Sequence, residues 1–202
     1  MKLYYSPGAC SLASHIVLRE IGKPFALDRI DKASKKTEAG EDFLSINPKG
    51  AVPVLETAEG EVLTEGAAIL QFLADANGKE VLAPRAGTMA RARVQEMLNF
   101  VASELHIAFG PLFSKTSTTA EKDAAKSKIA EKFSWLERSL ADGRSHLTGK
   151  DFTVADAYAF VVANWANFTG IALDKWPRLK AFMERVAARA TVQAAMKAEG
   201  LI

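Results

Sequence analysis

The chain of 202 residues has a single cysteine, no long apolar run and little excess of charge of either sign. One cysteine excludes a disulfide within the chain and is typical of proteins from reducing compartments. The net charge is +2 with scattered basic residues, so nucleic acid is not favoured as a ligand. No apolar run could span a bilayer, and the N-terminal MKLYYSPG lacks the apolar core of a signal peptide. A cytoplasmic protein is therefore expected, with no membrane partner.

The first third of the chain has an α/β pattern. Lys2–Ser6 is short and partly aromatic and is followed by the breaker Pro7–Gly8, which predicts a strand and a turn. Leu12–Ile21 has helical periodicity, and Gly22 is a typical residue at a helix end. Phe25–Ile30 predicts a second strand, so the chain begins with a βαβ unit.

A hairpin and a helix complete this α/β domain. After a short helix at Glu41–Ile46, strands are predicted at Ala51–Glu56 and Glu61–Thr64, then a helix at Glu65–Ala76. Pro53 lies inside the first of these strands, and proline is unsuited to a central ladder. It indicates either an edge strand or a cis peptide bond before Pro53. The predicted order is βαβαββα.

No convincing strand follows, so the rest of the chain is predicted to be all-α. A linker is expected at 79–87, which separates an α/β domain at 1–78 from a helical domain at 88–202. Thr153 as N-cap and Asp156 three residues later form a capping box with a structural role. Apart from the helix after this box, helices are expected at 89–109, 119–140, 177–190 and 191–199.

The only cysteine, Cys10, lies at the start of the first predicted helix. Unpaired N–H groups and the positive end of the helix dipole favour a reactive thiolate there. Free cysteines are also commonly buried and unreactive. From the position of Cys10 alone, both interpretations stay open.

Short motifs along the whole chain carry a family resemblance. An α/β domain with a cysteine after its first strand and a proline opening its third resembles the thioredoxin fold. Cys10 has no second cysteine with which to exchange within the chain, so an outside thiol is needed. The sequence closely resembles the beta-class glutathione S-transferases of bacteria. The matching motifs are Tyr5–His15, Asn47–Leu55, Leu63–Ile69, Asn99, Ser103–His106 and Phe152–Tyr158.

This resemblance implies a glutathione-binding thioredoxin-like domain followed by a helical domain with the second-substrate pocket and dimer contacts. Glutathione is then a co-substrate, and neither a cofactor nor a metal is expected. The resemblance assigns the cysteinyl part of glutathione to the backbone of Val52, before a cis Pro53. It assigns the γ-glutamyl carboxylate to the N–H groups at Glu65 and Gly66, with the Glu65 side chain near the ammonium. Lys35 is assigned to the glycyl carboxylate.

The resemblance also implies a twofold homodimer in which the first long helix reaches the glutathione of the neighbouring subunit. The residues it assigns there are Asn99, Ser103, Glu104 and His106. Asn99, Ser103 and His106 are spaced i, i+4 and i+7, which places them on one helix face. Periodicity alone would interpret such a face as solvent-exposed.

The implied reaction is attack of the glutathione thiolate on a hydrophobic electrophile, in the service of detoxification. Cys10 and His106 are the catalytic candidates, and the Ser11 hydroxyl and Tyr5 also lie near the expected sulfur position. The family pattern lets Cys10 form a mixed disulfide with glutathione, so thiol–disulfide reductase, peroxidase or dehalogenase activity is an alternative. A non-catalytic ligand-binding or scaffold protein of the same fold is another.

Overall fold

The structure, a computed structural model, describes residues 1–202, and the contacts within it divide the chain into two units. Unit 1 comprises Met1–Glu80 together with Ala188–Ile202, and unit 2 comprises Val81–Ala187. The sequence-based division placed everything after residue 87 in one helical domain, whereas residues 188–202 group with the α/β part. The reason is the packing of the last helix against the first. None of the helices combines the length and the apolar composition needed to cross a membrane.

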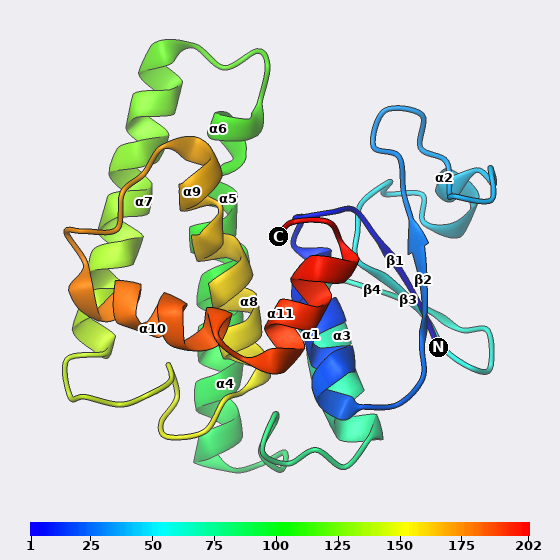
Figure 1. Ribbon diagram of the computed structural model, residues 1–202, viewed down its shortest axis with the longest axis horizontal. Coiled ribbons are helices and arrows are strands. Elements are labelled where there is room, and N and C mark those ends of the chain that lie inside the picture. Colours follow the sequence, from blue (N-terminus) through cyan, green and yellow to red (C-terminus); the bar gives the residue numbers. More distant parts are fainter. The chain divides into compact units, whose positions relative to one another are not determined.

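Unit 1 is built on a four-stranded mixed sheet with the order β2-β1-β3-β4 (Figure 1). Strand β1 (Lys2–Tyr5) pairs in parallel with β2 (Ala26–Arg29) and antiparallel with β3 (Val54–Glu56), which forms a hairpin with β4 (Val62–Thr64). Since β3 is an interior strand, the edge position considered for Pro53 is wrong. The Val52–Pro53 bond is cis, which was the other alternative.

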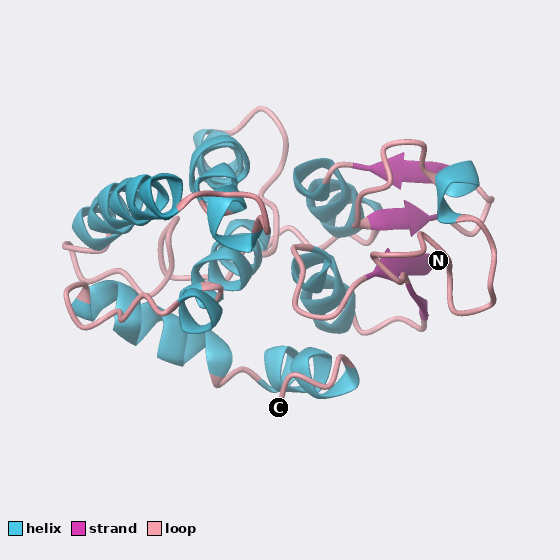
Figure 2. Ribbon diagram, turned by 90° about the horizontal axis from the view of Figure 1, so that it is seen from above, coloured by secondary structure: helices cyan, strands magenta, loops and turns pink.

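Helices cover both faces of this sheet and confirm the predicted βαβαββα order. Helices α1 (Ser11–Ile21) and α3 (Gly66–Ala76) lie side by side on one face (Figure 2). Helix α2 (Phe43–Ile46) packs on the other face, where its Phe43 forms a buried cluster with Tyr4, Ile30 and Val54. The core of unit 1 therefore lies on both sides of the strands.

The C-terminal helix α11 (Ala190–Ala198) belongs to unit 1 because it packs along α1. Its Val192 and Ala195 are fully buried. Arg189, just before the helix, binds both carboxylate oxygens of Glu20 at 2.9 and 3.0 Å. Figure 1 shows α11, in red, beside the blue α1.

Unit 2 consists of helices, as predicted for this part of the chain. Its α-helices are α4 (Met89–Phe100), α5 (His106–Ala108), α6 (Gly110–Phe113), α7 (Thr119–Ser139), α8 (Val154–Asn164), α9 (Ala166–Thr169) and α10 (Pro177–Ala187). The continuous helix predicted at 89–109 is wrong in one respect, because the π-helical turn η1 (Val101–Leu105) interrupts it. Val101 and Leu105 remain buried, so the spacing of apolar residues did not reveal the turn.

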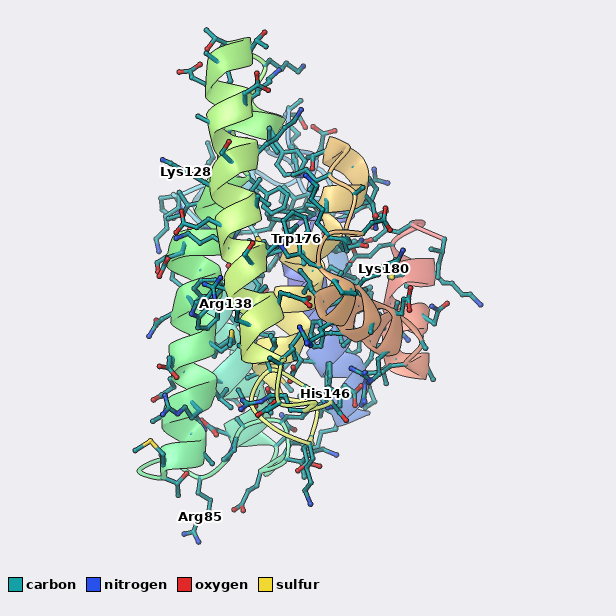
Figure 3. The ribbon with its side chains drawn as sticks, turned by 90° about the vertical axis from the view of Figure 1, so that its left-hand side faces the viewer. Arg85, Lys128, Arg138, His146, Trp176 and Lys180 are labelled. Carbon is teal, nitrogen blue, oxygen red and sulfur yellow. The ribbon has the colours of Figure 1, made fainter.

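Helix α8 forms the centre of unit 2, and its residues from Val154 to Ala163 are all buried. It begins after Thr153, whose N–H and hydroxyl both donate to Asp156 Oδ2 at 2.8 Å. Asp156 Oδ1 accepts the N–H of Leu147 at 2.8 Å. The neighbouring helix α10 is attached to α7 through Trp176, whose indole donates to Ser134 at 2.9 Å (Figure 3).

Candidate active site

The expected site residues of unit 1 gather around one short segment, Lys49–Pro53, which leads into β3. Lys35 Nζ donates to the carbonyl of Gly50 at 2.9 Å. The Cys10 thiol lies 3.2 Å from the carbonyl oxygen of Val52. Gly66 lies against Pro53, since a Cβ at Gly66 would be 3.7 Å from the proline ring. These residues come from four separate parts of the sequence, and the fold brings them to a single strand entrance.

Two opposing effects act on the Cys10 thiol, burial and the helix N-terminus. Burial raises its pKa to about 11, and the thiol donates to Val52 O. The N–H groups of Cys10 and Ser11 act in the expected direction and lower the pKa, but burial outweighs them. The sequence left a reactive thiolate and a buried, unreactive thiol as alternatives, and the raised pKa favours the second in the free protein.

Ser11 is fully buried, and its hydroxyl is engaged within the chain. Its Oγ accepts the N–H of Ser6 at 3.2 Å and lies 3.3 Å from the Ser6 carbonyl, to which it donates. A hydroxyl has one hydrogen to donate. This arrangement favours a role for Ser11 in holding the turn before Cys10 over a direct contact with sulfur.

The start of α3 has the geometry of an anion site. Glu65, the N-cap residue, has φ 70°, a left-handed conformation that is uncommon for a residue with a side chain and often marks functional sites. The N–H groups of Gly66 and Ala67 follow in the first turn, where the helix dipole favours negative charge. The Glu65 carboxylate is exposed and binds Lys49 Nζ at 2.6 Å. Lys49 was not predicted as a site residue, although it lies within the Asn47–Leu55 motif.

The expected residues of unit 2 lie on and beside the π-helical turn η1. Asn99, Ser103 and Glu104 are all exposed, and the Ser103 hydroxyl donates to the carbonyl of Asn99 at 2.8 Å. Glu104 is not free, because its carboxylate lies 2.9 Å from Lys132 Nζ on α7. Single π-helical turns within α-helices occur frequently at functional sites.

His106 differs from these three residues in being partly buried among aromatic rings. Its Nδ1 lies 2.8 Å from the Tyr158 hydroxyl, and its ring meets Trp165 edge to face with a centroid separation of 4.8 Å. Burial lowers the pKa of His106 below its ordinary value. The side chain is therefore a neutral imidazole at neutral pH, able to accept or donate one hydrogen bond through Nε2. Tyr158 lies in a family motif but was given no role.

Comparisons with known proteins agree with the motifs. Residues 8–76 match the family described as Glutathione S-transferase, N-terminal domain, and residues 100–190 match Glutathione S-transferase, C-terminal domain. The glutathione S-transferase GstA of Escherichia coli O157:H7 is 44% identical over 100% of both chains. A sphingomonad glutathione S-transferase solved with glutathione is 46% identical with a TM-score of 0.95. A bacterial beta-class enzyme of Sphingomonas chungbukensis is 46% identical with a TM-score of 0.96, and both structures match over 100% of each chain.

Proposed function

We propose that this chain, which belongs to the bacterial beta class of the glutathione S-transferase family and is a glutathione transferase, takes a hydrophobic electrophile as its second substrate. Unit 1 binds glutathione in this proposal, and unit 2 supplies the electrophile pocket and the contacts of a homodimer. Attack of the glutathione thiolate on an electrophilic carbon forms a carbon–sulfur bond and expels the leaving group. Such a reaction serves detoxification in the cytoplasm, where glutathione and a lone cysteine both stay reduced.

Glutathione lies along the Lys49–Pro53 segment in this proposal. The backbone of Val52 pairs with the cysteinyl part, as an added strand would. The carbonyl of Val52 faces the Cys10 thiol, which brings the glutathione sulfur near Cys10. Lys35 meets the glycyl carboxylate as a point charge. It now holds the Gly50 carbonyl in the same segment, which supports that assignment.

The γ-glutamyl end binds at the start of α3. Its carboxylate accepts from the N–H groups that begin with Gly66, and its ammonium pairs with the Glu65 carboxylate. Lys49 now neutralises Glu65 in an exposed ion pair, which is worth less than about 1 kcal/mol. Such a weak ion pair can break when glutathione binds, and the γ-glutamyl ammonium can then take the place of Lys49 beside Glu65. Lys49 then becomes free to approach the γ-glutamyl carboxylate.

Two groups act on the sulfur in different ways. Cys10, protonated at neutral pH, donates a hydrogen bond to the glutathione thiolate and thereby favours it over the thiol. His106, a neutral imidazole, accepts the thiol proton or steadies the sulfur through Nε2. Asn99, Ser103 and Glu104 contribute polar contacts to the glutathione of the partner subunit. The aromatic rings that surround His106 support a water-poor environment for this step.

A second activity follows from the same thiol. When Cys10 ionises, its thiolate can attack the glutathione sulfur of a mixed disulfide between glutathione and another thiol, form a Cys10–glutathione disulfide and expel that other thiolate. A glutathione thiolate then attacks the Cys10–glutathione disulfide, forms glutathione disulfide and releases the Cys10 thiolate. The high pKa of Cys10 makes this exchange slow in the free protein. Conjugation is therefore the main reaction, and reductase, peroxidase or dehalogenase chemistry the second candidate.

The observation that carries the proposal is the Cys10 thiol at 3.2 Å from the Val52 carbonyl. Intact mass after incubation with glutathione disulfide tests it, with Cys10→Ala as the comparison. We expect one reducible glutathione adduct on the native chain and none on the variant. The variant should retain glutathione binding and part of the conjugation of an activated aryl chloride. Absence of an adduct together with no binding to immobilised glutathione would refute the proposed site.

The pH dependence of Cys10 alkylation provides a separate test of its protonation state. Since the thiolate is the reactive form, alkylation by iodoacetamide should accelerate about tenfold per pH unit between pH 7 and pH 10, without a plateau. The sign follows from the raised pKa of about 11, which keeps the thiol protonated across this range. A plateau below about pH 8 would show instead that the helix N-terminus prevails.

A further inference from the structure

A buried polar cluster at the C-terminal end of the chain lies against the turn that precedes Cys10. Glu199, directly after α11, accepts the N–H of Gly8 through Oε2 at 3.0 Å. Its Oε1 lies 2.9 Å from Nδ1 of His15, and the side chains of Glu199 and His15 are both fully buried. Burying a carboxylate is unfavourable unless hydrogen-bond donors compensate for the lost water, so the donors of Gly8 and His15 make the burial of Glu199 possible. The function proposed above makes no use of them.

The direction of the hydrogen bonds is set by Arg19. Its Nε donates to Nε2 of His15 at 3.3 Å. A guanidinium can only donate, so Nε2 of His15 must accept and the ring proton must be on Nδ1. His15 is therefore a neutral imidazole that donates to Glu199. Arg19 thus donates to His15 and His15 donates to Glu199, whose second oxygen accepts the N–H of Gly8.

This series of hydrogen bonds from Arg19 to Glu199 holds one side of the turn that precedes Cys10. Gly8 has φ 68°, and the turn is closed by the N–H of Ala9 donating to the carbonyl of Ser6 at 3.0 Å. Ser11 binds Ser6 from within α1, as described above. Glu199 binds the turn from a position 191 residues along the chain. Without Glu199, the N–H of Gly8 would lose this buried acceptor.

The other end of α11 provides a natural comparison. Arg189 binds Glu20 through two hydrogen bonds, and Thr191 also donates its hydroxyl to Glu20. These contacts attach α11 to the C-terminal part of α1, away from the turn. The helix is thus held at both ends, but of these two attachments it is Glu199 that contacts the turn before Cys10.

We propose that Glu199 is a positioning residue for Cys10, which makes glutathione recognition in unit 1 depend on the last helix of the chain. His15 donates to one carboxylate oxygen of Glu199 and keeps it in place, and the other oxygen accepts the N–H of Gly8 in the Ser6–Cys10 turn. The turn then places the Cys10 thiol against Val52. The glutathione part of this inference rests on the function proposed above. The effect on Cys10 itself does not, because it can be measured without glutathione.

The test compares Glu199→Ala with Glu20→Gln, which weakens the other attachment of α11. Three quantities are measured: the alkylation rate of Cys10 by iodoacetamide, the dissociation constant of glutathione, and kcat and KM for conjugation. Glu199→Ala should speed alkylation and weaken glutathione binding, each by about fivefold or more, because an unheld turn exposes the thiol. KM for glutathione should rise more than kcat falls. Glu20→Gln should lower the melting temperature and leave both site measurements within about twofold.

A double variant tests the direction of the hydrogen bonds among Arg19, His15 and Glu199 and remains informative if Glu199→Ala does not fold. The carboxamide of Glu199→Gln can accept from only one of the two donors, Gly8 and His15. Removing Arg19 frees His15 to move its proton to Nε2, so Nδ1 can accept from the new amide. Arg19→Ala/Glu199→Gln should therefore recover much of the alkylation rate and glutathione affinity lost in Glu199→Gln alone.

Two results would overturn the proposal. One is a folded Glu199→Ala or Glu199→Gln protein whose Cys10 alkylation and glutathione affinity match the native chain. The other is an equal change in Glu20→Gln, which would make the effect a general loss of stability. If the native chain bound no glutathione, the proposed function would fail on its own, and the alkylation rates would still decide the role of Glu199.

Discussion

Two buried carboxylates, one in each unit, accept hydrogen bonds from backbone N–H groups, but with different consequences. In unit 2, Asp156 accepts from Leu147 and Thr153, all within a loop and helix start that the chain builds locally. In unit 1, Glu199 accepts from Gly8 and from His15, 184 residues away. The first fixes the entrance of the central helix of its unit, and the second fixes the turn beside the reactive thiol. A buried carboxylate that accepts backbone N–H groups thus stabilises the fold at Asp156 and positions the candidate active site at Glu199.

The candidate site residues differ between the units in a related way. In unit 1 the Cys10 thiol and the Lys35 ammonium contact backbone carbonyls of Lys49–Pro53, and the start of α3 offers backbone N–H groups. In unit 2 the site residues are side chains on a π-helical turn, held by other side chains such as Tyr158 and Lys132. Backbone contacts tolerate changes of side chain better than contacts between side chains do. We therefore expect single substitutions of site side chains to reduce activity more in unit 2 than in unit 1.

The largest effect is expected for Asp156→Ala. Removal of this carboxylate leaves the N–H groups of Leu147 and Thr153 buried without their acceptor. Each lost bond of this kind is unfavourable by about 1–3 kcal/mol, so the free energy of unfolding should fall by roughly 3 kcal/mol or more. Urea denaturation followed by circular dichroism measures this change.

Asp151→Ala, an exposed acid close to the same helix start, is the matched control and should change stability by less than about 0.5 kcal/mol. Under conditions where Asp156→Ala stays folded, its Cys10 alkylation rate should equal that of the native chain. A faster rate would mean that Asp156 also acts on the site, and the contrast with Glu199 would be lost.

Much of the fold could be predicted from the sequence because its signals are local. The breaker after the first strand, the glycine that ends α1 and the capping box before α8 each depend on a few neighbouring residues. Gly22, for instance, adopts the left-handed φ of 79° that a helix end of this kind requires. The π-helical turn and the grouping of α11 with unit 1 could not be predicted in this way. The first leaves the apolar spacing unchanged, and the second depends on packing between the two ends of the chain.

An intermediate effect is expected for Tyr158→Phe, which removes the hydroxyl at 2.8 Å from His106 and keeps the ring. His106 then loses the partner that orients it, so kcat for conjugation should fall by about 3- to 10-fold with little change in glutathione affinity. His106→Gln should reduce kcat by about 100-fold, the range of a lost acid–base group.

The pH profile sharpens this prediction. Burial lowers the pKa of His106, so the neutral imidazole persists to more acidic pH than an exposed histidine would allow. Any acid limb of kcat caused by His106 should therefore lie below about pH 6.5, and Tyr158→Phe should leave it there, since burial is the cause of the shift. An acid limb above that pH would assign the limb to another group.

The chemistry of the site was harder to predict than its location. The family resemblance indicated Cys10, Val52, Glu65 and Lys35, and the fold brings these residues to the Lys49–Pro53 segment. The state of Cys10 was not predictable, because desolvation depends on everything packed around the thiol. Glu199 gave no signal at all, since its partners lie at the opposite end of the sequence.

The smallest effect is expected for Lys49→Ala. Lys49 binds Glu65 in an ion pair whose side chains are 58% and 70% exposed, so its loss should change stability by less than about 0.5 kcal/mol. If Lys49 exchanges this partner for the γ-glutamyl carboxylate, the dissociation constant of glutathione should still rise about threefold, and more at low salt than at high salt. Calorimetry at two ionic strengths measures this, with Lys23→Ala as an exposed lysine control. A salt-independent change would place the recognition of that carboxylate on the N–H groups of α3 alone, in keeping with a site in unit 1 made chiefly by the backbone.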